Sequence, residues 1–177
     1  MKNIGKKFEE DFKKSCEANE KDILLERLND SAQSYGGKSS VRFTLSNPFD
    51  FYLYVDKTYP FFCLELKSKK GKSISFERNK PKKGENKGDI HYHQIQGLLQ
   101  RAKHKDVIAG LIINFRDLKK TYFININDFY RFVNSTEKKS INIVELLEYN
   151  AILIDSTLLR TRYRYNIQNF IDNFKER

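Results

Sequence analysis

Three charged side chains in the first half of the chain have the types and spacing of a metal-dependent phosphodiesterase site. Asp50 follows Asn47-Pro48-Phe49, and a single leucine separates Glu65 from Lys67. Two carboxylates can hold Mg²⁺ through oxygen, the ligand type that this ion prefers. The metal would lower the pKa of a bound water, and the lysine would orient that water or offset negative charge in the transition state.

A β-hairpin is the element expected to bring these side chains together. Phe49 to Val55 and Tyr59 to Lys67 are rich in aromatic and β-branched residues, and three polar residues lie between them. Because side chains alternate along a strand, Glu65 and Lys67 share a face, and antiparallel pairing places Asp50 across from the Glu65 region. The spacing also fits a simple surface ion pair between Glu65 and Lys67, so the pattern alone leaves both interpretations open.

The sequence is strongly basic, and most of the excess charge follows directly after these residues. The 177 residues contain 33 lysines and arginines against 23 acids, a net charge of +10, which favours a polyanionic partner such as nucleic acid. The stretch from Lys67 to Lys87 holds nine of these cations and two acids. Its glycines and proline predict a basic loop at about residues 68–89, which would hold a DNA backbone or remain a solvated loop without a ligand. The cations expected to bind DNA are Lys69, Lys70, Lys72, Arg78, Lys80, Lys82, Lys83 and Lys87.

The rest of the sequence predicts a single α/β (α+β) domain over residues 1–177, with a mixed β-sheet flanked by helices. Apolar residues at helical spacing predict helices at 4–20, 90–102 and 167–174, and shorter helices are expected from the Asn127 cap to Val133 and at 143–149. Strands are expected at 23–28, 72–76, 107–115, 121–126 and 151–154, and Asn29 to Ser40 is expected to be a loop.

Other features narrow the class of protein. Cys16 and Cys63 form no CxxC pair, and the chain has neither an apolar leader nor an apolar run of membrane-spanning length, so a cytoplasmic protein without membrane partners is expected. The alternation of Arg160, Arg162 and Arg164 with Tyr163 and Tyr165 fits a nucleic-acid surface and a strand with one solvated face about equally.

Beyond these patterns, the sequence resembles the PD-(D/E)XK nuclease superfamily and, within it, the RecU-type Holliday junction resolvases. Asn47-Pro48-Phe49-Asp50 followed by Glu65-Leu66-Lys67 resembles the superfamily signature. Gly5 to Phe12 resembles the opening helix of the RecU group, and His91-Tyr92-His93-Gln94-Ile95 resembles its stretch ending in His-Gln-Ile. The resemblance is strongest from Asn47 to Phe129.

The resemblance implies a restriction-endonuclease-like fold and a role for each site residue. Asp50 and Glu65 would bind Mg²⁺, with Mn²⁺ as a substitute, and Gln94 would help through its side-chain oxygen. Lys67 would stabilise the transition state. Glu9, rather than Glu10, matches the acidic position on the first helix near the site.

The implied activity is resolution of four-way (Holliday) DNA junctions in recombination and repair, by a homodimer that makes paired symmetric nicks. Two departures keep alternatives open. Pro48 stands where the family has a hydroxyl residue, and the basic stretch after Glu65 is longer than the family's. Another PD-(D/E)XK nuclease, of the branched-DNA or restriction type, and a non-catalytic basic DNA-binding module are the alternatives.

Overall fold

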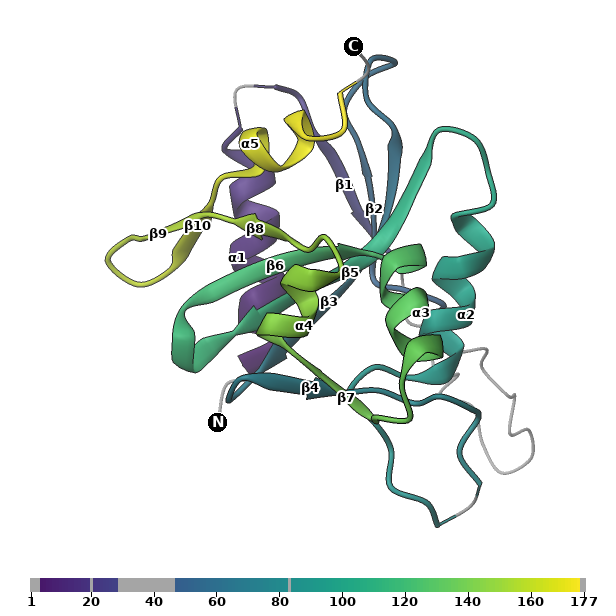
Figure 1. The fold of residues 1–177 in the computed structure, drawn as a ribbon. Helices are drawn as coiled ribbons and strands as arrows, with labels where there is room; N and C mark the ends of the chain where they lie inside the picture. Colours follow the sequence, from purple (N-terminus) through teal and green to yellow (C-terminus); the bar gives the residue numbers. More distant parts are fainter. Residues whose placement is uncertain (1–3, 20, 29–46, 83, 176–177) are drawn as a thin grey trace, which may run out of the picture.

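A six-stranded mixed sheet forms the centre of the protein in a computed structural model that describes residues 4–19, 21–28, 47–82 and 84–175 (Figure 1). The strand order is β1-β2-β3-β5-β6-β8. β3 and β5 run parallel, and the other neighbouring strands are antiparallel. The strands are β1 Leu24–Arg27, β2 Phe51–Tyr54, β3 Phe61–Lys69, β5 Val107–Phe115, β6 Lys120–Asn125 and β8 Ile152–Ile154.

Helices cover both faces of this sheet, which confirms the predicted fold class. α1 and α5 pack on one face, and α2, α3 and α4 pack on the other. Two small two-stranded sheets lie at the periphery, β4 with β7 and β9 with β10. The bounds are α1 Ile4–Glu17, β4 Ser73–Ser75, α2 Tyr92–Arg101, the 3₁₀ helix η1 Arg116–Leu118, α3 Ile126–Ser135, β7 Ser140–Asn142, α4 Ile143–Glu148, β9 Ser156–Leu158, β10 Tyr163–Tyr165 and α5 Ile167–Asp172. Among the residues that the structure describes, no helix is both long and apolar enough to cross a bilayer.

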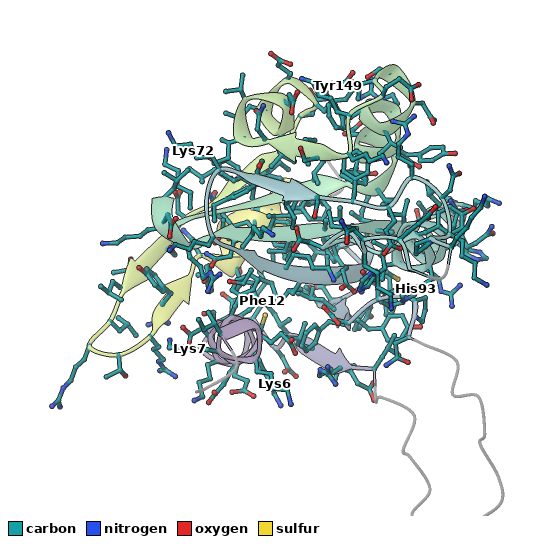
Figure 2. The ribbon with its side chains drawn as sticks, turned by 90° about the horizontal axis from the view of Figure 1, so that it is seen from below. Lys6, Lys7, Phe12, Lys72, His93 and Tyr149 are labelled. Atoms are coloured by element: carbon teal, nitrogen blue, oxygen red, sulfur yellow. The ribbon has the colours of Figure 1, made fainter. Side chains whose placement is uncertain are left out.

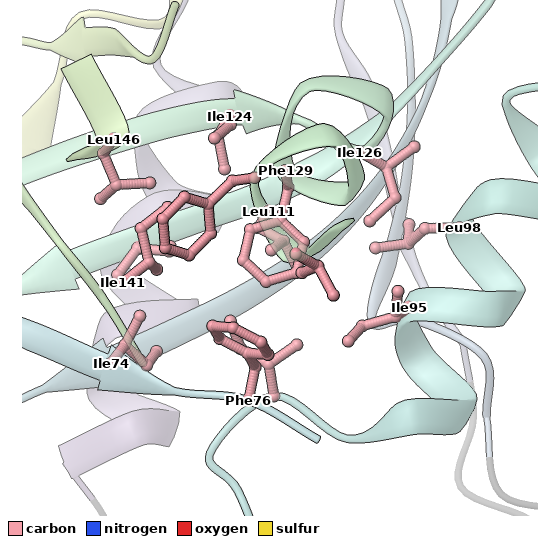
Figure 3. Packing of buried hydrophobic residues seen from close by; sticks show 14 of the residues in the cluster. Ile74, Phe76, Ile95, Leu98, Leu111, Ile124, Ile126, Phe129, Ile141 and Leu146 are labelled. Atoms are coloured by element: carbon pink, nitrogen blue, oxygen red, sulfur yellow. The ribbon is translucent and has the colours of Figure 1, made fainter. Parts of the chain in front are cut away.

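The core on the α2 face joins segments that lie far apart in the sequence (Figure 3). Ile95 and Leu98 of α2 and Phe129 of α3 lie over Leu111 of β5, and all four are almost fully buried. The adjoining core residues from β4, β7 and α4 include Ile74, Ile141 and Leu146. The β4–β7 sheet is therefore anchored to the main body by its apolar side chains.

The core on the opposite face explains the alternation of arginine and tyrosine near the end of the chain. Phe12 of α1 points toward the sheet, whereas Lys6 and Lys7 point away from it (Figure 2). Tyr165 of β10 is only 4% exposed, and its ring centroid lies 5.6 Å from that of Phe8 and 6.0 Å from that of Phe12. The segment is thus a strand with one packed face, and Tyr165 is unavailable as a stacking platform for nucleic acid.

The structure corrects some expectations from the sequence, and one expectation falls outside the described residues. The predicted basic loop is partly regular structure, because β3 continues to Lys69 and β4 lies within the stretch. Asn125, not Asn127, caps α3, since its side-chain oxygen accepts the Asn127 N–H. β10 agrees with the strand interpretation of the arginine and tyrosine alternation, whereas its partner β9 was not predicted, because a three-residue strand is too short for a clear period. The predicted loop at 29–40 lies outside the described residues.

A glycine allows α2 to approach the segment that leads into β2. A Cβ atom on Gly97 would overlap the Pro48 side chain and lie 2.9 Å from the Pro48 carbonyl oxygen. One turn further along α2, the Arg101 guanidinium lies 5.8 Å from the ring centroid of Phe49. The two contacts hold α2 against the residues directly before Asp50.

Replacing Gly97 by alanine is therefore expected to destabilise the protein, although alanine favours helix. The overlap with Pro48 should cost about 1–3 kcal/mol, against roughly 1 kcal/mol gained in helix propensity. Urea unfolding measures the net effect. Gln100→Ala, on the exposed side of the same helix, is the control that reports helix propensity without the overlap. A Gly97→Ala protein as stable as the Gln100→Ala protein would show that the close approach is unimportant.

Candidate active site

The hairpin of β2 and β3 brings Asp50 to Glu65 and Lys67. Phe51 pairs with Leu64, which places Asp50 directly beside the middle of β3. The Asp50 N–H donates to the Leu64 carbonyl at 3.1 Å, and Asp50 Oδ2 accepts the Leu66 N–H at 2.9 Å. Main-chain hydrogen bonds therefore fix both the backbone and the carboxylate of Asp50.

Glu65 lies at the centre of the site and is only 1% exposed. Its Oε1 accepts hydrogen bonds from Lys67 Nζ at 2.8 Å and from Gln94 Nε2 at 2.5 Å. Its Oε2 is also buried and has no hydrogen-bond partner among the described residues. A buried carboxylate oxygen without a partner carries a large desolvation cost, so this atom is suited to a cation that is bound from outside the chain.

The surroundings of the two carboxyl groups disfavour their charged forms. Burial, followed by the charge of Asp50, raises the pKa of Glu65 to about 8, despite the nearby Lys67 ammonium. Burial also raises the pKa of Asp50, although the Leu66 N–H and the charges of Lys67 and Arg27 oppose this shift. The structure therefore contains two neighbouring acids whose negative charges are incompletely compensated by the protein.

Glu9 reaches the edge of this site from α1, and Glu10 does not. The negative charge of Glu9 contributes to the raised pKa values of both Asp50 and Glu65. Its Oε2 accepts a hydrogen bond from Arg27 Nε of β1 at 3.1 Å. The Glu10 side chain is 61% exposed and pairs along the helix with Lys14. The charge of Glu9 thus acts on both carboxyl groups, and its role in catalysis stays a prediction.

Gln94 contacts the site through its nitrogen rather than its oxygen. Its amide oxygen accepts the His91 N–H at 2.9 Å and completes the capping box of α2, while its amide nitrogen donates to Glu65. In this arrangement Gln94 orients Glu65 and ties the start of α2 to β3. The expected metal contact through the Gln94 oxygen is not formed here and stays a prediction.

The donor set resembles a Mg²⁺ site more than a closed metal cage. Within the described ranges, no group of three or more His, Cys, Asp or Glu side chains is arranged to hold a metal ion. Mg²⁺ usually keeps several waters and binds through one or two carboxylates. Asp50 and Glu65, with the unpartnered Glu65 Oε2, fit that mode of binding.

The basic residues after Glu65 form two separate groups instead of one continuous loop. Lys72 of the β3–β4 turn and His93 of α2 lie on opposite sides of the molecule (Figure 2). Lys69 and Lys70 lie close to Lys72 in the sequence, and Lys80 and Lys87 line a cleft together with residues of α2. The exposed cations of this stretch are therefore spread over more than one part of the surface.

Within these groups, two of the predicted DNA contacts are engaged by the protein itself. Lys69 Nζ lies 2.8 Å from both carboxylate oxygens of Asp89, and Arg78 donates to the carbonyl oxygens of Thr136 and Lys138. The exposed members are Lys70, Lys72, Lys80, Lys82 and Lys87. Lys83 lies outside the described residues.

Sequence patterns missed two charged residues that organise the site. Arg27 of β1 pairs with Glu9, and Asp89 accepts hydrogen bonds from Lys69, Ser75 N–H and Ser75 Oγ. Each bond joins residues at least 14 positions apart. A single sequence contains no local signal for such pairs, because tertiary packing alone brings them together.

Comparison with known proteins shows which family the chain is similar to. The family model described as "RecU: Recombination protein U" matches residues 67–169, more than half of the chain. The SPbeta prophage-derived uncharacterized protein YotM of Bacillus subtilis (strain 168) is 32% identical over 138 residues, which cover 77% of this chain and 63% of that protein. The chain therefore spans less than two thirds of this relative's length. The family match begins at Lys67, so the roles of Asp50 and Glu65 depend on the geometry described above.

The raised pKa of Glu65 leads to a prediction for stability in EDTA. The folded protein keeps the Glu65 proton up to about pH 8, whereas the unfolded chain releases it near pH 4.5. This carboxyl group therefore contributes stability that is present below about pH 4.5 and is lost as the pH rises toward 8. The free energy of unfolding, measured with urea, should therefore fall more between pH 5 and pH 8.5 for wild type than for Glu65→Gln. For the exposed control Glu148→Gln on α4, this free energy should fall as much as for wild type. If the free energy of unfolding of Glu65→Gln fell with pH in parallel with that of wild type, the raised pKa of Glu65 would be contradicted.

Proposed function

Because the chain belongs to the RecU family of recombination proteins, we propose that it is a metal-dependent DNA endonuclease that resolves four-way junctions. The observation that carries the proposal is the buried Glu65 beside Asp50 and Lys67, whose Oε2 has no hydrogen-bond partner in the described part of the chain. A protein that only bound DNA through surface lysines would gain nothing from burying an acid in this way. This geometry favours an enzyme over a non-catalytic DNA-binding module.

Asp50 and Glu65 would hold Mg²⁺, or Mn²⁺ as a substitute, and Gln94 would complete the set after rotation of its amide. When bound, the metal supplies a water of lowered pKa and polarises a phosphoryl oxygen. Hydrogen bonds within the protein already orient the carboxylates of Asp50 and Glu65. The Leu66 N–H orients the Asp50 carboxylate, and Gln94 Nε2 orients that of Glu65. The burial of Glu65 keeps bulk water from its oxygens and strengthens its attraction to a cation.

Lys67 is the residue suited to the transition state. Its ammonium lies 2.8 Å from Glu65 Oε1, and its side chain is 17% exposed, so it bridges the buried acid and the surface. At that position it would donate to a scissile phosphate oxygen as negative charge develops there. Glu9 and Arg27 flank the carboxylates and would order the water on the α1 side.

The proposal extends to a homodimer with paired symmetric nicks. One chain carries one set of Asp50, Glu65 and Lys67, and resolution of a four-way junction requires two cuts in strands of like polarity. Two copies related by a two-fold axis would present two such sites to the two-fold symmetry of the junction. The exposed lysines of the stretch after Lys67 would bind the backbones of the arms.

Incubating a labelled four-way junction with the protein, with and without Mg²⁺, tests the substrate. We expect two symmetric nicks that require the metal, and Mn²⁺ should replace Mg²⁺. A flap and a linear duplex of the same sequence serve as comparison substrates. Equal cutting of all three would identify a different nuclease of this superfamily, and tight, salt-sensitive binding without cutting would identify a DNA-binding module.

Substitutions test the assignment of the site. Asp50→Asn and Glu65→Gln should each lower the rate of cleavage at least about a hundredfold, because a neutral amide binds Mg²⁺ much more weakly than a carboxylate does. DNA affinity in EDTA should stay within about twofold. Glu148→Gln makes the same chemical change on α4 and should cleave at the wild-type rate. Wild-type cleavage by Asp50→Asn and Glu65→Gln would place the active site elsewhere.

A further inference from the structure

A cleft of about 620 Å³ lies beside the candidate active site, between the start of α2 and the chain that leads into it. Its volume is within the range of pockets that bind small organic ligands. None of its lining residues is used in the chemistry proposed above. They are Glu77, Lys80, Pro81, Lys87, His91, Tyr92, His93 and Gln96.

The cleft contains a prepared aromatic surface. The rings of His91 and His93 are stacked, with 5.6 Å between their centroids and 13° between their planes. Glu77, which is only 8% exposed, holds His91 through a 2.9 Å contact with Nδ1 and accepts the Tyr92 N–H at 2.8 Å. The His93 side chain is exposed on the outer side of this stack. A buried carboxylate therefore fixes the inner ring, and the outer ring remains accessible to a ligand.

Cations and an amide complete the lining. Lys80 and Lys87 are exposed, and neither has an acidic partner among the residues that the structure describes. Glu77 is the one acid in the lining, and its oxygens are occupied by His91 and Tyr92. Gln96 adds a side chain that can donate to and accept from the edge of a base. Aromatic faces beside unpaired lysines are the combination that binds unpaired nucleotides.

From this arrangement we propose that the cleft binds one unpaired nucleotide of the DNA, with its base stacked on His93 and its phosphates next to Lys80 and Lys87. A base in a duplex exposes only its edges, so its face can reach His93 only when the base is unpaired. The base pairs at the branch point of a four-way junction are the least well stacked in that substrate, so a base opens there at the lowest cost. The cleft would thus recognise branched DNA by binding a base that has opened at the branch point, independently of base sequence.

The position of the cleft links it to cleavage. His93 directly precedes Gln94, whose amide nitrogen donates to Glu65. The charge of Lys67 contributes to the lowered pKa of His93, after burial and the charge of His91, so the ring lies close enough to the site to feel that lysine. A nucleotide on His93 would therefore position a neighbouring phosphate toward Lys67. This link to the scissile phosphate rests on the proposed function. The binding of an unpaired base does not, and it is measurable without metal.

The test compares two DNA duplexes in EDTA by fluorescence anisotropy, one fully paired and one with a single bulged adenine. Wild type should bind the bulged duplex about tenfold more tightly. His93→Ala should abolish this preference, and His93→Phe, which keeps an aromatic face, should retain it. His104→Ala, an exposed histidine beyond the end of α2, should behave as wild type. Equal affinity of wild type for the two duplexes, or equal loss in His93→Ala and His93→Phe, would overturn the proposal.

The lysines are tested separately from the base. The double variant Lys80→Ala/Lys87→Ala should bind both duplexes more weakly and lower the slope of log affinity against log salt concentration by about two. Lys57→Ala, at the far turn of the β2–β3 hairpin, should leave the slope unchanged. An unchanged slope in the double variant would exclude the proposed phosphate contacts.

The same variants separate the two proposals. Asp50→Asn should lose cleavage and keep the preference for the bulge, whereas His93→Ala should lose the preference. If the wild-type protein cleaves junctions with metal but binds the bulged and the paired duplex equally, only the proposal of a nucleotide-binding cleft would be overturned. A preference for the bulge in a protein that never cleaves DNA would overturn the proposed nuclease alone.

Discussion

The buried carboxylate of Glu65 is the constraint around which the rest of the site is arranged. A carboxyl group at 1% exposure is costly to bury, above all in its charged form, and Lys67 and Gln94 supply hydrogen bonds to one of its oxygens. The second oxygen has no hydrogen-bond partner among the residues that the structure describes. Strand β3 must therefore place an acid inside the protein, and α2 must begin close enough to reach it.

The capping box of α2 connects helix formation to the site. Gln94 accepts the His91 N–H with its oxygen, which leaves only its nitrogen to donate to Glu65. The close contact at Gly97 then holds the helix against Pro48, two residues before Asp50. As a result, a shift of α2 would move Gln94 and Asp50 relative to Glu65 at the same time.

The positions of the lysines and arginines in the structure divide the excess positive charge into two parts. Part of it stabilises the protein itself, through Lys69 with Asp89 and Arg78 with two carbonyl oxygens. The other lysines that the structure describes in the stretch after Lys67 are exposed, namely Lys70, Lys72, Lys80, Lys82 and Lys87. Net charge alone suggested binding to a polyanion, and the division between structural and exposed cations shows which of them are free to contact it.

The sequence by itself determined the local features of this protein. The hairpin, the shared face of Glu65 and Lys67, the helix at 90–102 and the buried strand at 107–115 follow from alternation and helical periodicity, which depend on near neighbours along the chain.

Only the tertiary structure decided what those residues face. It paired Glu9 with Arg27 and Lys69 with Asp89, turned the nitrogen of Gln94 toward Glu65, and packed Tyr165 against α1 instead of leaving it exposed. It also stacked His93 on His91 beside a cleft. The physical reason is that these contacts join distant segments, whose relative positions are set by packing of the whole core and leave no periodic trace in the sequence.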